Sequence, residues 1–494
     1  MIGVLFVITI LILFIWKDTE KPQGFPPGPK WLPIVGSIPL IQQLHQFYKF
    51  YHLVWQHFTS YYGPVVGFRI GRDKLVVVSG REAIKELYSR EEFNGRPKGF
   101  FFRVRTFGKR EGVVFTDGHD WETLKRFSLK AMKQLGNGRS GMIAHIEKEA
   151  AEMVEYFRSK ADTELPVDMG HAFDVPVLNV MWALLAGYRF HTDDDRLLML
   201  LSKIHDSFRV IDMSGGILNQ FPFIRHIFPE KSGYRKLVQT HLPIWNFLVE
   251  TVVEIRDKMV PNTPPKSIIE AFLIEIESKN ANSSVYNSEQ LLAICLDFFQ
   301  AGSETTSNTL GFGIIYMLHY PEILRKVREE IDMVVSRSRT PCLADRPNLP
   351  YTEAVIYEIQ RFANVAPLAI AHRALSTTKF YDYVIPEDTI VIVSTYSLNM
   401  DKSYWKDPHN FRPERFLDEE GRLVHYDAFI PFGLGKRRCM GENLARSSLF
   451  LFFSSFVQNF DVILFEGQPL PDIEGLDGIT LSPKPYKAVL KIRN

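Results

Sequence analysis

The hydrophobic pattern describes a mostly helical body preceded by one uncharged apolar segment. Residues 1–16 carry no charged side chain, and a charged cluster follows at 17–21. At about 1.5 Å of rise per residue, a helix of this length spans about 24 Å, slightly less than the hydrocarbon core of a membrane. The segment has no basic start and no small-residue cleavage site, which favours an uncleaved anchor over a signal peptide or a buried helix. We therefore expect an N-terminal membrane anchor over residues 1–20.

A proline-rich stretch follows the anchor. Residues 21–40 include the run Pro26-Pro27-Gly28-Pro29, and Pro33, Gly36 and Pro39 come after it. Because proline fixes φ and cannot continue a helix, the stretch predicts a stiff, extended spacer. The remaining residues, 41–494, are expected to form one domain.

Helical periodicity dominates that domain. Apolar positions recur at helical spacing over 142–158, 171–188, 239–259 and 289–319, and Pro321 begins another helix. Short β-branched runs predict strands at Val65–Ile70, Lys74–Val78, Thr389–Ser394 and Tyr486–Ile492. The length of 494 residues alone suggests about three domains, but the chain shows no internal repeat and no second linker. The pattern predicts a single large, mainly α fold with a minor β-sheet region.

Composition excludes several classes of protein. Apolar residues make up 46% and charged residues 23%, which excludes disordered, collagen-like and coiled-coil chains. Lys and Arg number 58 against 57 Asp and Glu, so no overall positive field exists to attract nucleic acid. The three cysteines, Cys295, Cys342 and Cys439, are too few for a disulfide framework and fit a reducing compartment.

The strongest candidate for chemistry is Cys439. It follows Lys436, Arg437 and Arg438 and stands between glycines. Nearby cations lower the pKa of a thiol, and glycines let a planar group approach the backbone. The helix expected from Glu442 onwards also favours an anion at its N-terminus. One alternative is that Cys439 is an inert buried cysteine, which is common. The other is that the glycines form a phosphate-binding loop, but the required G-x-x-x-x-G-K-[ST] spacing is missing, which excludes it.

The pattern Phe432-x-x-Gly435-x-Arg437-x-Cys439-x-Gly441 resembles the haem-binding signature of the cytochrome P-450 (haem-thiolate monooxygenase) family. Three further segments match landmarks of that family in the same order, across essentially the whole chain: Ala301–Thr306, Glu358–Arg361 and Pro413–Phe416. The apolar N-terminus followed by Pro26-Pro27-Gly28-Pro29 is similar to the microsomal members. The resemblance implies a single cytochrome P-450 fold behind an anchor helix.

The resemblance also implies haem b as cofactor and a role for each matching residue. Cys439 would be the axial ligand of the haem iron. The residues expected to surround or hold the haem and its propionates are Arg96, Trp121, Lys125, His372, Phe432, Arg437 and Gly441. Lys125 stands where the family has arginine, so the charge is kept but the planar fork is lost. Glu358, Arg361 and Arg415 would form a buried structural cluster, and Thr305 with Glu304 would relay protons to bound O₂.

No flavin or nicotinamide fingerprint occurs in the chain, so its electrons must come from a partner. The resemblance implies NADPH–cytochrome reductase in the same endoplasmic reticulum membrane, with the catalytic domain in the cytosol. An acidic partner would dock on a basic group formed by Lys125, Arg126, Lys130, Lys133, Lys436 and Arg438. A second contact with membrane lipid is expected around Ile217–Phe228.

Three functions are compatible with a haem thiolate: a monooxygenase, a haem carrier or sensor without turnover, and an isomerase. Thr305 beside an acid favours the monooxygenase, since the other two can dispense with a proton relay. The substrate pocket is expected to include 98–115, 205–225, Phe298, Ala301, Val365–Ile370 and Ile479.

The overall pattern looks most like insect microsomal members, among which are farnesoate epoxidases of juvenile hormone synthesis and xenobiotic oxidases. We expect Phe100, Phe101, Phe102 and Phe107 to line a channel for an unsaturated chain, with Arg103 or Arg105 holding its carboxylate or ester. The alternative is that these phenylalanines belong to the core and the cations are solvated. The hypothesis is epoxidation of a farnesoate-type sesquiterpenoid, with broad hydroxylation of xenobiotics or steroids as the alternative.

Overall fold

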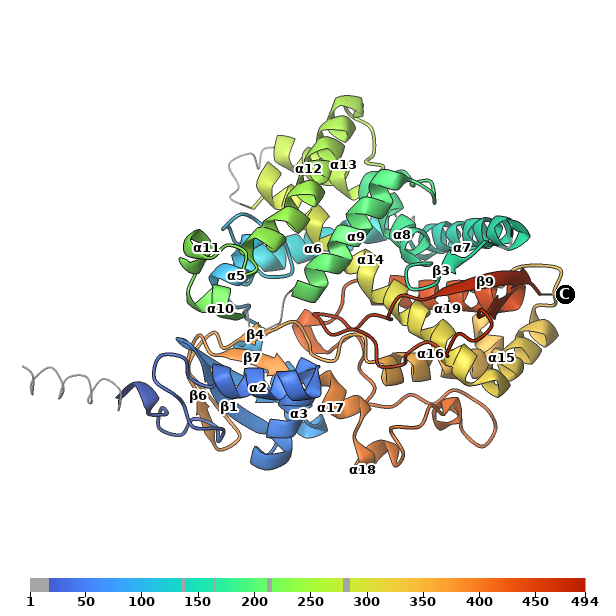
Figure 1. Cartoon of the computed structure of the whole chain (residues 1–494). Coiled ribbons are helices and arrows are strands. Elements are labelled where there is room, and N and C mark those ends of the chain that lie inside the picture. The colour runs from blue at the N-terminus through green and yellow to red at the C-terminus, as the bar shows by residue number, and fades with distance from the viewer. Residues whose placement is uncertain (1–16, 136–137, 164, 211–215, 279–284, 494) are drawn as a thin grey trace, which may run out of the picture.

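The computed structural model describes residues 17–135, 138–163, 165–210, 216–278 and 285–493. Residues 1–16, which make up most of the expected anchor, lie outside the described part. No helix within these ranges is both long enough and apolar enough to cross a membrane. Figure 1 shows a small sheet-containing region beside a larger helical one, with the first described residues at the sheet end.

The main sheet joins strands from the two halves of the chain. Its order is β1 (Val65–Ile70), β2 (Asp73–Val78), β7 (Ile390–Val393) and β4 (His372–Arg373). β1 and β2 form an antiparallel hairpin, and β2 pairs in parallel with β7. Alternate residues of β2 enter two different hydrophobic clusters, one on each face, which is the period-two pattern of a covered strand. The strands expected from β-branched runs are confirmed to within a residue or two.

The proline-rich stretch is packed against this sheet and is not a free spacer. Gly67 of β1 donates its N–H to Pro27 O at 2.7 Å. Phe25 and Trp31 are buried in the same hydrophobic cluster as Val65 and Val391. The prolines therefore fix an extended path along the sheet, and the folded body begins well before residue 41.

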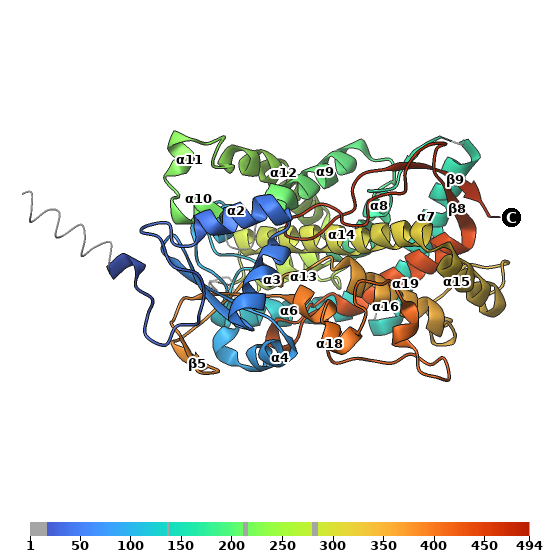
Figure 2. The same cartoon turned by 60° about the horizontal axis from the view of Figure 1, so that its bottom comes forward.

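The central helix is α14 (Ser288–His319). Asn287 begins it by accepting a hydrogen bond from Gln290 N at 2.9 Å. It contacts α8 (Asp174–Ala186), α12 (Tyr234–Lys258), α16 (Pro350–Ala363) and α19 (Glu442–Asn459). A Cβ at Gly302 would lie 3.0 Å from Met181 Cβ, so this glycine allows α8 to pack closely on α14. α14 therefore crosses the middle of the helical region (Figure 2).

The remaining elements surround this core. The long helices expected from periodicity are confirmed, with ends shifted by a few residues; the helices between 38 and 135 were not anticipated from apolar periodicity. The other helices are α2 (Ile38–Tyr48), α3 (Tyr51–Tyr62), α4 (Arg81–Ser89), α5 (Phe100–Val104), α6 (Gly118–Leu135), α7 (Gly138–Thr163), α9 (Asp195–Val210), α10 (Gly216–Gln220), α11 (Ile224–Ile227), α13 (Ile268–Glu277), α15 (Pro321–Val334), α17 (Thr395–Asn399) and α18 (Lys402–Trp405). Short 3₁₀ turns are η1 (Glu91–Phe93), η2 (Arg346–Asn348), η3 (Pro413–Phe416) and η4 (Gly435–Arg437). The minor strands are β3 (Val167–Asp168), β5 (Thr378–Phe380), β6 (Tyr383–Ile385), β8 (Phe460–Ile463) and β9 (Lys487–Ile492).

Candidate functional site

A cavity of about 390 Å³ lies between α14 and the loop that precedes α19. Thr305 of α14 lines it on one side, and Cys439 of the loop lines it on the other. The structure brings to this one cavity every residue expected to contact the cofactor: Arg96, Trp121, Lys125, His372, Phe432, Arg437, Cys439 and Gly441. These residues come from segments spread over more than three hundred positions of sequence, and the fold alone unites them.

Glycines shape the loop that carries Cys439. Gly433 and Gly435 have φ of 70° and 67°, a region that side chains rarely adopt. A Cβ at Gly435 would also stand 2.4 Å from Tyr88 O, so α4 approaches the loop too closely for any side chain there. Cys439 N donates to Phe432 O at 2.9 Å and closes the turn. The loop therefore presents Cys439 to the cavity from a fixed backbone.

The electrostatic setting of Cys439 differs from the sequence expectation. Burial raises the pKa of its thiol, and the Gly441 N–H and the Arg438 charge offset only part of that increase. Arg438 is itself paired with Glu442 at 2.5 Å, which reduces its effect on the thiol. The cations of the loop therefore do not hold a thiolate by themselves.

Cations without anionic partners line the same cavity. The Arg437 guanidinium carbon lies 3.7 Å from the centre of the Trp121 ring. Its Nε and Nη2 donate to backbone carbonyls, while its Nη1 is buried and has no partner among the described residues. Burial, with a contribution from Arg96, lowers the pKa of Arg437 to about 8. Arg96 is buried too, and within the described part of the chain its guanidinium donates only to the backbone carbonyls of Val114, Ile370 and Ala371.

This arrangement fits haem. An anionic ligand would satisfy the free Arg437 nitrogen and offset the buried positive charge, and haem carries two carboxylates. Gly441 lines the cavity, and a Cβ built on it would meet no atom of the described residues within 4 Å, its chain neighbours aside. The thiol on one face, the guanidinium groups at the edge and the open backbone together suit a planar iron porphyrin.

Two of the expected propionate partners make other contacts as well. His372 is buried, and its Nδ1 donates to Phe93 O at 2.7 Å. Burial and the neighbouring Arg96 hold the pKa of His372 well below its usual value, so the ring is neutral. The Lys125 ammonium donates to Lys436 O and lies 4.9 Å from the centre of the Trp121 ring. Lys125 therefore ties α6 to the Cys439 loop as well as lining the cavity.

The structure separates the two residues of the expected proton relay. Thr305 lines the cavity, and its hydroxyl donates to Ala301 O at 3.2 Å. Glu304 is fully buried and does not line the cavity. Its carboxylate accepts hydrogen bonds from His205 Nδ1 at 2.5 Å and Arg209 Nη2 at 2.7 Å. Successive residues of a helix point about 100° apart, so Glu304 faces the α9 side while Thr305 faces the cavity.

Charge compensation keeps Glu304 ionised in this position. Burial raises the pKa of Glu304, but His205 and Arg209 outweigh burial and leave it below the usual value. Asn308 Nδ2 and Thr480 Oγ1 each donate to the same carboxylate at 3.1 Å. Glu304 therefore does not line the cavity beside Thr305, contrary to what the expected relay implied, and its part in proton transfer stays a prediction. The sequence prediction placed His205 and Arg209 within the substrate-pocket segment 205–225 and did not anticipate that they pair with Glu304.

The three predicted structural residues lie together and are fully paired. Arg361 donates to both oxygens of Glu358 at 2.7 Å, and Arg415 Nε donates to Glu358 at 3.1 Å. Both members of the Glu358–Arg361 pair are 0% exposed. Arg361 also donates to the carbonyls of Asn399 and Pro408, so the cluster ties α16 to the segment between α17 and η3.

The substrate side of the cavity is not lined by the phenylalanines that were expected to form a channel. Phe100, Phe101, Phe102 and Phe107 do not line it, and neither does Ile479 or any residue of 205–209 and 218–225, the parts of that segment whose side chains are described. Arg103 is also absent from the lining, and Arg105 forms a buried ion pair with Asp297 at 2.5 Å. The expected segments that do contribute are represented by Val113, Val114, Phe298, Ala301, Val365, Ala366, Ala369 and Ile370. Val177, Val180 and Met181 of α8 were missed, because a continuous apolar run does not distinguish a cavity wall from core.

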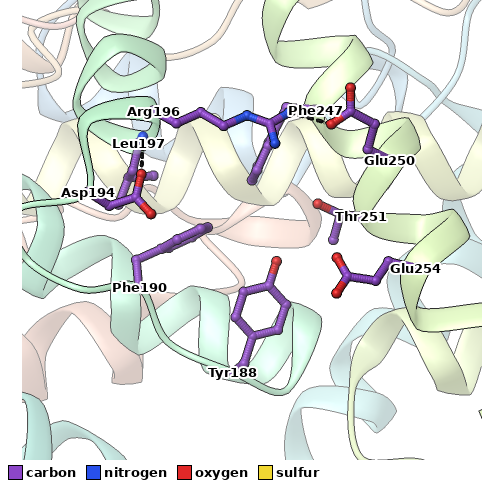
Figure 3. A pocket seen from close by; sticks show the side chains of 9 residues that line it. All are labelled: Tyr188, Phe190, Asp194, Arg196, Leu197, Phe247, Glu250, Thr251 and Glu254. Atoms are coloured by element: carbon purple, nitrogen blue, oxygen red, sulfur yellow. Dashed lines mark hydrogen bonds and ion pairs between the residues drawn. The ribbon is translucent and has the colours of Figure 1, made fainter. Parts of the chain in front are cut away.

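A second, smaller cavity of about 170 Å³ lies between the end of α8, the start of α9 and α12 (Figure 3). Its lining includes Tyr188, Phe247 and Glu254, and Arg196 pairs with Glu250 at its rim. It shares no lining residue with the cavity at Cys439. It holds none of the residues that the sequence marked for chemistry.

Comparisons with known proteins agree with this geometry. The family model Cytochrome P450 matches residues 26–490. The chain is 39% identical to farnesoate epoxidase of Bombyx mori, over 99% of this chain and 98% of that protein. It is 36% identical to probable cytochrome P450 305a1 of Drosophila melanogaster, over 99% of both chains. It is 35% identical to cytochrome P450 2C28 of Mesocricetus auratus, over 92% of this chain and 91% of that protein.

Proposed function

The chain belongs to the cytochrome P450 family, whose members are monooxygenases, and we propose that it epoxidises a farnesoate-type sesquiterpenoid ester, with haem b as cofactor. The observation that carries the proposal is the likeness to farnesoate epoxidase over the full length of both chains. The wall of the cavity supports it, since residues such as Val180, Met181 and Phe298 would surround an unsaturated hydrocarbon chain.

The distribution of charge around the cavity favours an ester over the free acid. The lining cations are Arg96, Lys125, Lys436, Arg437 and Arg438, all in the part of the cavity suited to haem. Arg105, the expected partner of a substrate carboxylate, is already neutralised by Asp297. A buried carboxylate without a cation is costly, whereas a neutral ester needs only weak polar contacts.

The residues of the chain would hold the haem iron, exclude water from the substrate and supply a proton. Haem, when bound, supplies the activation of O₂, and Cys439 would hold its iron. The apolar residues of α8 and α14 exclude water from the substrate. Of the two residues expected to relay protons, Thr305 lines the cavity. Its hydroxyl would hold a proton there. Glu304 would contribute from behind α14, through its hydrogen bonds with His205 and Arg209.

The assay that tests this function combines the haem-loaded enzyme, its reductase and NADPH with methyl farnesoate or with farnesoic acid. We expect the epoxide of the distal double bond, formed faster from the ester. Phe298→Ala should weaken substrate binding, whereas Phe107→Ala should not, because Phe107 is half exposed and packs on Trp245 away from the cavity. Preferential turnover of the acid would contradict the charge argument.

The alternative is a broad hydroxylase of xenobiotics or steroids. The likeness to cytochrome P450 2C28 at 35% identity favours this second reading. The same assay decides between the two: no epoxide from either farnesoate substrate, together with turnover of unrelated lipophilic compounds, would establish the alternative.

Electron transfer requires a docking site near Cys439, and we propose that NADPH–cytochrome reductase binds the basic group defined above. Arg126, Lys130 and Lys133 are exposed on α6. The hydrogen bond from Lys125 to Lys436 O joins that helix to the Cys439 loop, so these charges flank the thiol side of the cavity. Replacing Arg126, Lys130 and Lys133 with glutamate should slow reduction by the reductase and leave reduction by dithionite unchanged.

We also propose that the sheet end of the molecule rests on the endoplasmic reticulum membrane. Phe223, Ile227 and Phe228 are 59%, 60% and 54% exposed around α11. Leu32 and Ile34 are 49% and 57% exposed in the segment before α2. Both groups adjoin the β1–β2 turn, since Arg72 N donates to Gln220 of α10 and Gly36 pairs with Ile70. The first described residues lie at this same end (Figures 1 and 2).

A deletion of residues 1–16 tests this contact, because it leaves the Asp18–Arg69 ion pair intact. The shortened chain should still bind phospholipid vesicles peripherally. Phe223→Asp should reduce that binding, whereas Met333→Asp, 85% exposed on α15, should not. Loss of all vesicle binding on deletion would show that the apolar patch makes no contact.

A further inference from the structure

Three side chains that can bind a metal meet behind α14, outside the haem cavity. His171 lies in the turn before α8, Asp174 is the first residue of α8, and His205 is on α9. One ligand atom from each lies within 4.8 Å of the other two. We propose that His171, Asp174 and His205 form a binding site for a divalent transition-metal ion, with Zn²⁺ as its probe.

The geometry around Asp174 supports the site. Asp174 Oδ2 lies 2.6 Å from His205 Nε2 and 3.1 Å from His171 Nδ1. The centres of the two imidazole rings are 4.3 Å apart, so both rings converge on the same carboxylate. Bonds of about 2.0–2.1 Å to a tetrahedral zinc separate neighbouring ligand atoms by about 3.3 Å. Metal binding would require the three side chains to rotate until their ligand atoms reach that spacing, and a water molecule would supply the fourth ligand.

An unsatisfied atom in the cluster points to a missing ligand. Asp174 is 3% exposed, and its Oδ1 is buried without a hydrogen-bond partner among the residues described. Leaving a buried carboxylate oxygen unpaired costs free energy, and such atoms are uncommon in native structures. A metal ion held by the carboxylate would remove that cost, because either oxygen or both can bind it.

Glu304 orients the His205 ring in the way that neighbouring hydrogen-bond acceptors orient histidine ligands in known metal sites. His205 Nδ1 bonds to Glu304 at 2.5 Å, which directs Nε2 toward Asp174. A carboxylate is one of the common partners of the second nitrogen of a histidine ligand in metal sites, together with backbone carbonyls and water. Arg209 contacts Glu304 through the other carboxylate oxygen. Its positive charge is therefore directed at Glu304 and not at the ligand atoms.

The site is accessible from solvent and independent of the haem cavity. The side chain of His171 is 41% exposed, whereas those of Asp174 and His205 are 4% and 14% exposed. None of the three residues lines the cavity at Cys439. Metal binding does not depend on the proposed substrate.

The experiment titrates Zn²⁺ into the detergent-solubilised, haem-loaded full-length chain after treatment with a chelator, in competition with a chromophoric chelator of micromolar affinity. We expect the native chain to bind one equivalent of zinc more than the His171→Ala chain, or to bind it at least about ten-fold more tightly. His171 is exposed, so its removal leaves the core packing unchanged. His409→Ala, which removes an exposed histidine elsewhere, should bind like the native chain.

X-ray absorption at the zinc edge gives a second readout that does not depend on activity. Two imidazole groups and oxygen in the first shell would support the site. Sulfur in the first shell would overturn it, since the metal would then sit on a cysteine. Equal zinc binding by the native and His171→Ala chains would also overturn it. No zinc binding by the native chain would show that the three residues form only a hydrogen-bonded chain.

Discussion

Glu304 and Thr305 are neighbours in α14, yet Thr305 faces the cavity and Glu304 faces His205 and Arg209 on α9. Because the carboxylic acid and the hydroxyl are adjacent in sequence, they suggest a single proton relay. The structure gives them different surroundings, so they are expected to respond differently to substitution.

Thr305→Ala should keep the thiolate spectrum of the carbon monoxide complex and divert reducing equivalents from product to hydrogen peroxide. The reason is that it removes the hydroxyl that faces the cavity, while Cys439 is untouched. The ratio of product to NADPH consumed measures the effect. Ser303→Ala is the matched control, because Ser303 is buried on the same helix and bonds Phe299 O without lining the cavity. Unchanged coupling in Thr305→Ala would show that the proton reaches the site another way.

The sequence anticipated the residues of the haem site better than those of the substrate site. The residues expected around haem were identified by the Cys439 motif or by their position in the family resemblance, and all of them line one cavity. The phenylalanines of 100–107 fail as a predicted channel because sequence cannot tell which face of a short helix meets a cavity. Phe102 packs on Phe115 in the interior, and Phe107 is half exposed. Likewise, the partner of Arg105 is Asp297, far along the chain, and only the fold pairs them.

The second prediction concerns the buried cluster behind the site. Glu358→Gln should lower the free energy of unfolding by about 3–5 kcal/mol, because it leaves the buried guanidinium groups of Arg361 and Arg415 without their carboxylate. Chemical denaturation of the haem-loaded chain measures it. Glu329→Gln is the control, since it removes an exposed i,i+4 pair with Arg325 and should leave the midpoint unchanged. Equal midpoints for the two variants would contradict a structural role for the cluster.

The third prediction concerns the loop that carries Cys439. Gly435→Ala places a methyl group against Tyr88 O and also imposes a side chain at a φ of 67°. The loop must move away from α4, so we expect a lower haem content per chain and loss of the thiolate spectrum. Gly467→Ala separates the steric contact from the backbone strain. Gly467 has a φ of 77°, but apart from its chain neighbours no atom of the described residues lies within 4 Å of its Cβ position. That variant should lose about 1 kcal/mol of stability and keep its haem.

The last prediction concerns a buried histidine remote from the cavity. Burial lowers the pKa of His52 to about 3, and its Nδ1 has no hydrogen-bond partner among the described residues. The ring lies 4.6 Å from that of Tyr396, in an environment that cannot solvate a charge. A histidine whose pKa is lower in the folded state than in the unfolded state contributes stability above its unfolded pKa of about 6.5. That contribution is lost as the pH falls from about 6.5 toward 3, because the unfolded chain takes up the proton first.

At pH 5 the loss amounts to about 2 kcal/mol relative to pH 7.5, at about 1.4 kcal/mol for each pH unit below the unfolded pKa of about 6.5. Urea unfolding at the two pH values measures it. His52→Phe keeps an aromatic ring against Phe50 and Tyr396, so we expect it to be less sensitive to acid than the native chain by that amount. His409→Phe changes an exposed ring and should retain the native pH dependence. If the native chain and His52→Phe lost equal stability between pH 7.5 and pH 5, then His52 would be protonated as readily in the folded chain as in the unfolded one.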